Sequence, residues 1–204
     1  MSDVRISIGV LAPVISVDGS ETRLIGILNR RALSLGQRRY AAIGGAVELT
    51  TEGIIYLQRR FDARAFEGSD ARFIVDEQHV DDVLEFFERR SRHYYEVDPD
   101  RELGEELTQR ELPIQSGPLL TDAQFDEVYP VFVRVHREAP EADASARQGS
   151  IPTRRLYFLY RLDTTAEIMA VLEQSPAVRF FTDEEVQSGA TADGSATVAG
   201  NIIR

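Results

Sequence analysis

Two apolar segments near the start of the chain, joined by an Asp-Gly pair, most restrict how this sequence can fold. Residues 4–17 and 22–29 are rich in β-branched and other apolar side chains, and Asp18-Gly19 lies between them. β-branched residues favour strands, and Asp-Gly is a preferred pair for a tight hairpin turn. The sequence therefore predicts an antiparallel hairpin over these residues.

Strand-like and helix-like patterns alternate through the rest of the chain. We expect helices over residues 51–61, 77–90, 166–173 and from 183 onward, and strands over 72–75, 127–137, 155–162 and 178–181. Pro130 predicts that the strand over 127–137 lies at a sheet edge or carries a bulge. This order of elements predicts an α/β sandwich in which a mixed sheet lies between helices.

Two finer patterns concern how the helices begin and which side they bury. In the helix over 51–61, the apolar residues Ile54, Ile55, Leu57 and Phe61 are expected to face inward, although Gly53 weakens the helix signal. Thr164 with Glu167, and Thr182 with Glu185, have the spacing of capping boxes. Each pair therefore predicts the start of a helix.

Composition excludes several classes of protein. The chain has 204 residues and no cysteine, which excludes disulfides and thiolate metal sites. A net charge of −11 disfavours general nucleic-acid binding. All basic residues are arginines, so any phosphate clamp must use guanidinium groups. Without a signal-like start or a long apolar run, a cytoplasmic location is expected, with no membrane association.

An acidic segment after residue 98 carries the main functional signal. Asp98 and Pro99 suit the start of a helix, and Glu102, Glu105 and Glu106 then follow at spacings that share one helix face. Clustered carboxylates repel one another unless a cation lies between them. Hard oxygen ligands suit Mg²⁺ or Mn²⁺, whereas a solvated acidic helix face is the plainer alternative.

The acidic segment resembles the second half of the Nudix hydrolase box. The matching residues are Arg101, Glu102, Leu103, Glu105 and Glu106, and the glycine pair Gly44-Gly45 lies upstream, as in that family. The resemblance implies that Glu102, Glu105 and Glu106 bind the metal ion and that Arg101 orients them and the loop. It assigns Gly44 and Gly45 to the loop that contacts the cofactor or substrate.

The resemblance is divergent. Ile43 replaces the usual proline, Thr108 replaces the box glycine, and the Arg-Glu pair falls at 101 and 102 instead of near position 59. The box is therefore split by an insertion. We expect one Nudix-like domain over residues 1–187, with the insertion at 52–97, and a flexible or docking tail over 188–204. In general appearance the chain is also similar to the SMODS-associated Nudix group of bacterial defence systems.

These resemblances imply one of two functions. The first is Mg²⁺- or Mn²⁺-dependent hydrolysis of a phosphoanhydride in a nucleoside diphosphate derivative or signalling nucleotide. The second is a weakly active or inactive module that senses a nucleotide, and a scaffold without a ligand ranks third. The partner expected is a small nucleotide, and a homodimer is a further expectation because dimers are the commonest homo-oligomers.

Two other groups of residues allow two readings each. Arg30, Arg31, Arg38 and Arg39 either form a rim that binds phosphate or keep a loop soluble. The aromatic pair at 94 and 95 either stacks on a nucleobase or belongs to the core.

Overall fold

The computed structural model describes residues 2–90, 93–109, 114–115, 117–138, 141–142 and 151–203. The chain divides into two compact units, which are described separately below. Unit 1 comprises residues 1–10, 46–98 and 134–158, and unit 2 comprises residues 11–45, 99–133 and 159–204. Within the described chain, no helix is long and apolar enough to cross a membrane.

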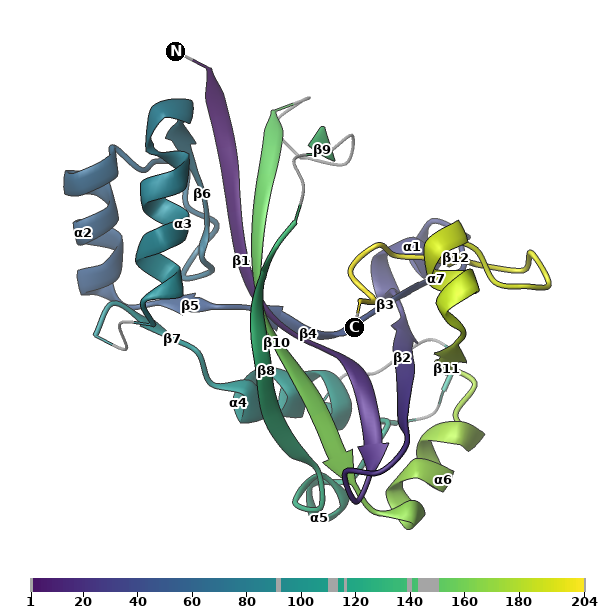
Figure 1. Ribbon diagram of the computed structural model, residues 1–204. Helices are drawn as coiled ribbons and strands as arrows, with labels where there is room; N and C mark the ends of the chain where they lie inside the picture. Colours follow the sequence, from purple (N-terminus) through teal and green to yellow (C-terminus); the bar gives the residue numbers. More distant parts are fainter. Residues whose placement is uncertain are drawn as a thin grey trace. The chain divides into compact units, whose positions relative to one another are not determined.

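Most strands form a large mixed sheet, as the sequence predicts, and β5 pairs with β7 in a separate two-stranded sheet. The strand order of the large sheet is β12-β3-β2-β1-β10-β8, while β4 and β6 also pair with β1, β9 pairs with β10 and β11 pairs with β2 (Figure 1). β12 is parallel to β3, whereas β2 is antiparallel to both β1 and β3. The mixed α/β fold confirms the predicted class and is consistent with a Nudix-like α/β/α sandwich. β8 ends the strand order, as Pro130 predicts.

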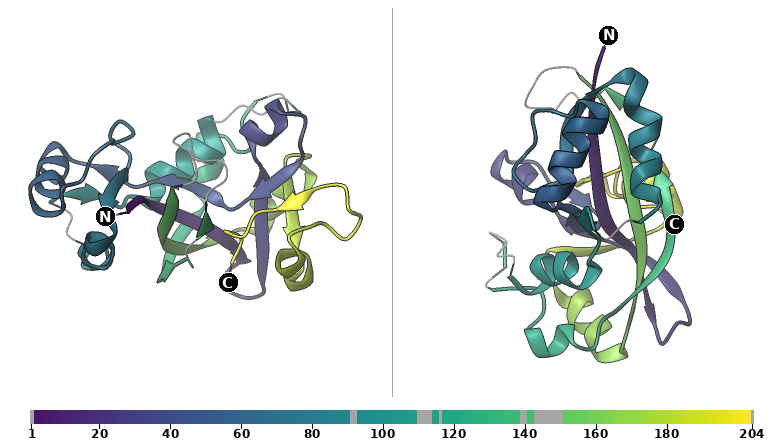
Figure 2. Two further views of the ribbon diagram at one scale, coloured as in Figure 1. Left: turned by 90° about the horizontal axis from the view of Figure 1, so that it is seen from above. Right: turned by 90° about the vertical axis from the view of Figure 1, so that its left-hand side faces the viewer.

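Unit 1 combines strand segments with a pair of helices. Its elements are the first part of β1 (Asp3–Val17), β5 (Glu48–Leu49), α2 (Thr51–Phe61), β6 (Arg72–Asp76), η1 (Glu77–His79), α3 (Val80–Glu88), β7 (Tyr95–Glu96), β9 (Glu141–Ala142) and much of β10 (Pro152–Thr164). α2 and α3 lie side by side (Figure 2). Phe61 of α2 and Phe86 of α3 have ring centroids 6.3 Å apart, and Tyr95 of β7 packs on the buried Phe87 ring.

Unit 2 contains the remaining elements. They are β2 (Thr22–Leu28), α1 (Arg30–Ser34), β3 (Arg39–Ala41), most of β4 (Ile43–Ala46), α4 (Pro99–Gly104), η2 (Glu105–Gln109), α5 (Asp122–Phe125), the start of β8 (Tyr129–Arg137), α6 (Ala166–Gln174), β11 (Val178–Phe181), α7 (Asp183–Ser188) and β12 (Thr197–Val198). The predicted hairpin is present, with Ser16 opposite Thr22. Asp18 and Gly19 both have positive φ, at 51° and 71°, as a tight hairpin turn requires.

The helix over 51–61 is confirmed, and the structure explains its glycine. Thr50 caps α2 by accepting a hydrogen bond from Gly53 N, and the Thr50 hydroxyl also donates to the Tyr94 carbonyl at 3.1 Å. A Cβ at position 53 would lie 1.9 Å from that carbonyl oxygen, so glycine is required by close backbone packing. The prediction that Ile55 faces inward is wrong, because its side chain is 41% exposed.

Of the two predicted capping boxes, the one formed by Thr182 and Glu185 is present, whereas the prediction for Thr164 and Glu167 is wrong. Thr182 and Glu185 make both reciprocal bonds at the start of α7. Thr164 does not cap α6, because β10 extends to this residue and its carbonyl accepts a hydrogen bond from Asp18 N in the hairpin turn. The next residue, Thr165, is the N-cap and accepts from Ile168 N.

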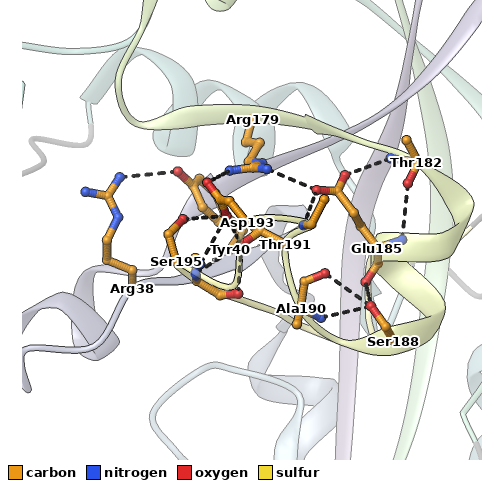
Figure 3. Close-up of polar contacts among 12 residues, drawn as sticks. Arg38, Tyr40, Arg179, Thr182, Glu185, Ser188, Ala190, Thr191, Asp193 and Ser195 are labelled. Atoms are coloured by element: carbon orange, nitrogen blue, oxygen red, sulfur yellow. Dashed lines mark hydrogen bonds and ion pairs between the residues drawn. The ribbon is translucent and has the colours of Figure 1, made fainter.

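Glu185 also holds the C-terminal segment of unit 2 (Figure 3). Its buried carboxylate accepts hydrogen bonds from Thr182 N at 3.1 Å, Ala192 N at 2.9 Å and Arg179 Nη2 at 3.0 Å. Burial by itself raises the pKa of Glu185, but these three donors outweigh it, and the net pKa is lowered. Ile202 is fully buried, so the last described residues pack against the unit.

We predict that Glu185→Gln lowers the stability of the fold at neutral pH by about 1–3 kcal/mol, because a charged acceptor with three donors is lost. The folded pKa lies below 4.5, so this contribution is complete above that pH and is lost as the pH falls through the folded value. Urea unfolding from pH 7 to pH 3 should show the difference from wild type shrinking in acid. Glu184→Gln, which changes the neighbouring exposed residue, is the matched control, and equal stability of the two variants would contradict this role.

Candidate functional site

The acidic helix of unit 2 begins where the sequence predicts and is anchored by its apolar side. α4 starts at Pro99, and Leu103 and Leu107 are fully buried. Leu120 N donates a hydrogen bond to the Leu107 carbonyl at 2.9 Å, and the Phe125 ring packs against Gly104. The apolar side chains therefore anchor the helix in unit 2, and its glutamates lie on the other sides.

A change of helix type redirects the glutamates. From Glu105 to Gln109 the backbone forms a π-helical turn, η2, and the Thr108 hydroxyl donates to the Gly104 carbonyl at 3.0 Å. π-helical turns are rare and occur often at functional sites. Because such a turn has more residues than an α-helical one, the simple i, i+3, i+4 geometry does not hold. Glu102 is buried, Glu106 is half-buried, and the Glu105 side chain is 49% exposed.

Arg101 is the cation between the carboxylates. Its Nη2 donates to Glu102 Oε1 at 2.5 Å, and its Nη1 donates to Glu105 Oε1 at 3.1 Å. The Arg101 side chain is only 30% exposed, so these ion pairs are partly shielded from water. One guanidinium therefore offsets the repulsion between two of the three glutamates.

The glycine pair lies directly against this ion pair. A Cβ built on Gly45 would be 2.0 Å from Glu102 Oε2, so the buried carboxylate fits only because residue 45 has no side chain. Gly44 has φ of 142°, a conformation that favours glycine. The structure thus accounts sterically for both glycines and brings together Gly45, Arg101, Glu102 and Glu105, which are distant in the sequence.

Glutamate carboxylates are hard oxygen donors of the kind that bind divalent ions together with a phosphate ligand. Among the described residues, no three His, Asp or Glu side chains are gathered as a metal-binding group. Mg²⁺ usually binds one or two carboxylates and completes its coordination with water and substrate phosphates. Adjacent Glu105 and Glu106 could supply two hard oxygen ligands, whereas Glu102 would contribute only if its carboxylate turned away from Arg101.

A hollow of about 490 Å³ adjoins the start of α4 in unit 2. It is lined by Pro99, Asp100, Phe125, Asp126, Val128, Tyr129 and Pro130. The Tyr129 side chain is 62% exposed, and the two carboxylates give the hollow acceptors for amino groups. The sequence patterns predicted a helix start at Pro99 and a sheet edge or bulge at Pro130, but they indicated no binding site here. A tyrosine directly before Pro130, in the strand expected over 127–137, was the available signal.

The outcomes differ for the other candidates from the sequence, which are the aromatic pair at 94 and 95 and the arginines near α1. Tyr95 is buried in unit 1, which is the core reading, whereas Tyr94 is half-buried. Arg30 and Arg31 are exposed on α1, and Arg38 Nη2 lies 3.5 Å from the Tyr40 hydroxyl. Both readings of these arginines stay open.

Comparison with known proteins identifies the family. Residues 3–202 match the model of the SMODS-associated NUDIX domain, so the chain belongs to this family. No curated protein and no solved structure matches the chain. Membership indicates a nucleotide-related hydrolase or sensing module of defence systems, with a small nucleotide as ligand. Nudix domains generally use divalent metal ions.

We predict that Gly45→Ala destabilises the fold by about 1–3 kcal/mol, because its Cβ must displace the Glu102 carboxylate from a buried position. Chemical unfolding measures the change, and Gly200→Ala, which has open space around it, is the matched control. In the background of Glu102→Ala, the same Gly45 substitution should have little effect, because the clash is gone. Additive effects in this double-mutant cycle would show that the two residues do not interact.

Proposed function

We propose that this protein is a cytoplasmic, divalent-metal-dependent hydrolase of a phosphoanhydride in a nucleoside diphosphate derivative or signalling nucleotide. The observation that carries the proposal is the pair of contacts from Arg101 to Glu102 and Glu105 beside Gly45. If the acidic helix face were only solvated, no glutamate would need to be buried against a glycine. Family membership supports the same reading.

In this proposal, Glu105 and Glu106 hold Mg²⁺ or Mn²⁺, and Glu102 joins them when its carboxylate turns from Arg101. A divalent ion in such a site neutralises the charge of a pyrophosphate and lowers the pKa of bound water. Arg101 keeps the carboxylates oriented while the site is empty of substrate. When the Glu102 carboxylate turns away, the loop backbone at Gly44 and Gly45 opens to the phosphates, and the hollow beside Tyr129 offers a place for the nucleoside.

Two features support a second candidate, a nucleotide sensor without turnover that serves a bacterial defence system. Arg101 already satisfies Glu102 and Glu105, and the described residues gather no three-carboxylate group. A ligand that binds without displacing Arg101 would be retained intact. The two candidates share a binding site and differ only in whether water attacks the bound phosphoanhydride.

Turnover separates the two candidates. We predict that, with Mg²⁺ or Mn²⁺ in ¹⁸O-labelled water, mass spectrometry of a panel of nucleoside diphosphate derivatives will detect cleavage of one class, with ¹⁸O in one phosphate product. Glu106→Gln should abolish this turnover in a folded protein, because a metal ligand is lost. Glu21→Gln makes the same change in charge at an exposed site and should retain activity.

The sensor predicts a different result in the same assay. Wild-type protein would then bind a nucleotide tightly, and the ligand would be recovered unlabelled after hours with either metal ion. That recovery would overturn the hydrolase proposal and leave the binding site in place.

A further inference from the structure

The side of α2 in unit 1 carries an open hollow of about 500 Å³, a size common for small-molecule sites. It is lined by Glu52, Ile55, Tyr56, Arg59, Arg60, His93 and Tyr94. A second hollow of about 150 Å³ shares Tyr56 and Arg60 with it. The larger hollow exposes mostly apolar surface between charged side chains, which suits a ligand that is itself partly apolar and partly ionic.

The aromatic part of the hollow consists of rings that pack against one another. Tyr56 and Tyr94 have ring centroids 4.6 Å apart with planes inclined by 30°, and Tyr56 stacks on Phe86 at 5.1 Å. The backbone of Tyr94 is fixed by Thr50 and by its contact with Gly53. Tyr56 and Tyr94 remain half-buried, so their rings form a firm apolar surface of the kind on which nucleobases stack.

The cationic part lies on the last turn of the same helix. Arg59 and Arg60 are exposed, and neither forms an ion pair with any residue in the described chain. In contrast, Arg64 pairs with Asp3 and Asp76 in the same unit. Two guanidinium groups without carboxylate partners are suited to a phosphate, which they bind through paired hydrogen bonds.

An acidic residue at the other end of α2 makes the two ends of the hollow differ in charge. Glu52 is seven residues before Arg59, so their Cα atoms are separated by about 10 Å along the helix axis. A carboxylate repels phosphate and accepts hydrogen bonds from ribose hydroxyls or base amino groups. A ligand with one anionic end, an aromatic ring and hydrogen-bond donors matches this arrangement better than a polyanion, and the net charge of −11 also disfavours a long nucleic acid.

We infer that this hollow binds a mononucleotide, with the base against Tyr56 and Tyr94 and the phosphate at Arg59 and Arg60. The site belongs to unit 1 and uses none of the residues of the proposed hydrolase site. It therefore goes beyond the proposed function and does not depend on it. No divalent ion is required, because the arginines themselves carry the charge that the phosphate needs.

The test is calorimetric titration of the full chain with AMP in EDTA, which removes metal-dependent binding elsewhere. Wild type should bind AMP, and Glu105→Gln/Glu106→Gln should bind it equally. Arg59→Gln/Arg60→Gln should weaken binding at least about tenfold, and so should Tyr94→Leu, whereas Tyr94→Phe should retain it. The matched control for charge is Arg23→Gln/Arg161→Gln, two partly exposed arginines that do not line the hollow, and this variant should bind as wild type does.

Three outcomes would overturn the inference. The first is no binding of AMP by wild type, and the second is binding that the two exposed arginine substitutions leave unchanged. The third is equal binding of ribose 5-phosphate and AMP, because a simple anion site would not distinguish them. Circular dichroism of each variant verifies folding, and the arginine pair keeps the test decisive even if Tyr94→Leu fails to fold.

Discussion

The ion pairs between Arg101 and the glutamates of the acidic helix are the interaction on which the rest of the candidate site depends. Without a cation, carboxylates this close would repel one another and push the helix side chains apart. Arg101 offsets that repulsion for Glu102 and Glu105, and Gly45 leaves the space in which the buried Glu102 carboxylate lies. The two halves of the motif, the glycine pair and the acidic helix, are thus in contact. The fit of Glu102 against Gly45 is the steric part of this contact, and the ion pairs of Arg101 are the electrostatic part.

The same contact determines how the two proposed functions differ. In an enzyme, a carboxylate must break its ion pair with Arg101 so that it can bind a metal ion together with the nucleotide. In a sensor, the ion pairs with Arg101 can remain. Glu105, at the start of the π-helical turn over Glu105–Gln109, is exposed, whereas Glu102 stays buried. Exposure makes Glu105 available to an incoming cation without unfolding the helix.

The sequence predicted the periodic elements well, because hydrophobic alternation and turn residues act locally. The hairpin at Asp18-Gly19 and the helix over 51–61 follow directly from such patterns. Contacts between segments that are distant in the sequence could not be predicted from these patterns. Nothing in the pattern indicates that Gly45 must accommodate Glu102, or that Gly53 must accommodate the Tyr94 carbonyl. The change from α- to π-helix after Gly104 also has no local signature, so the expected single face of glutamates was too simple.

Anomalous diffraction from crystals grown with Mn²⁺ and a non-hydrolysable nucleoside diphosphate analogue tests the central claim most directly. We expect a strong manganese peak at coordination distance from carboxylate oxygens of Glu105 and Glu106, with the remaining coordination from water and phosphate. A well-occupied analogue with no manganese peak at these glutamates, or with Arg101 alone facing its phosphates, would contradict the account.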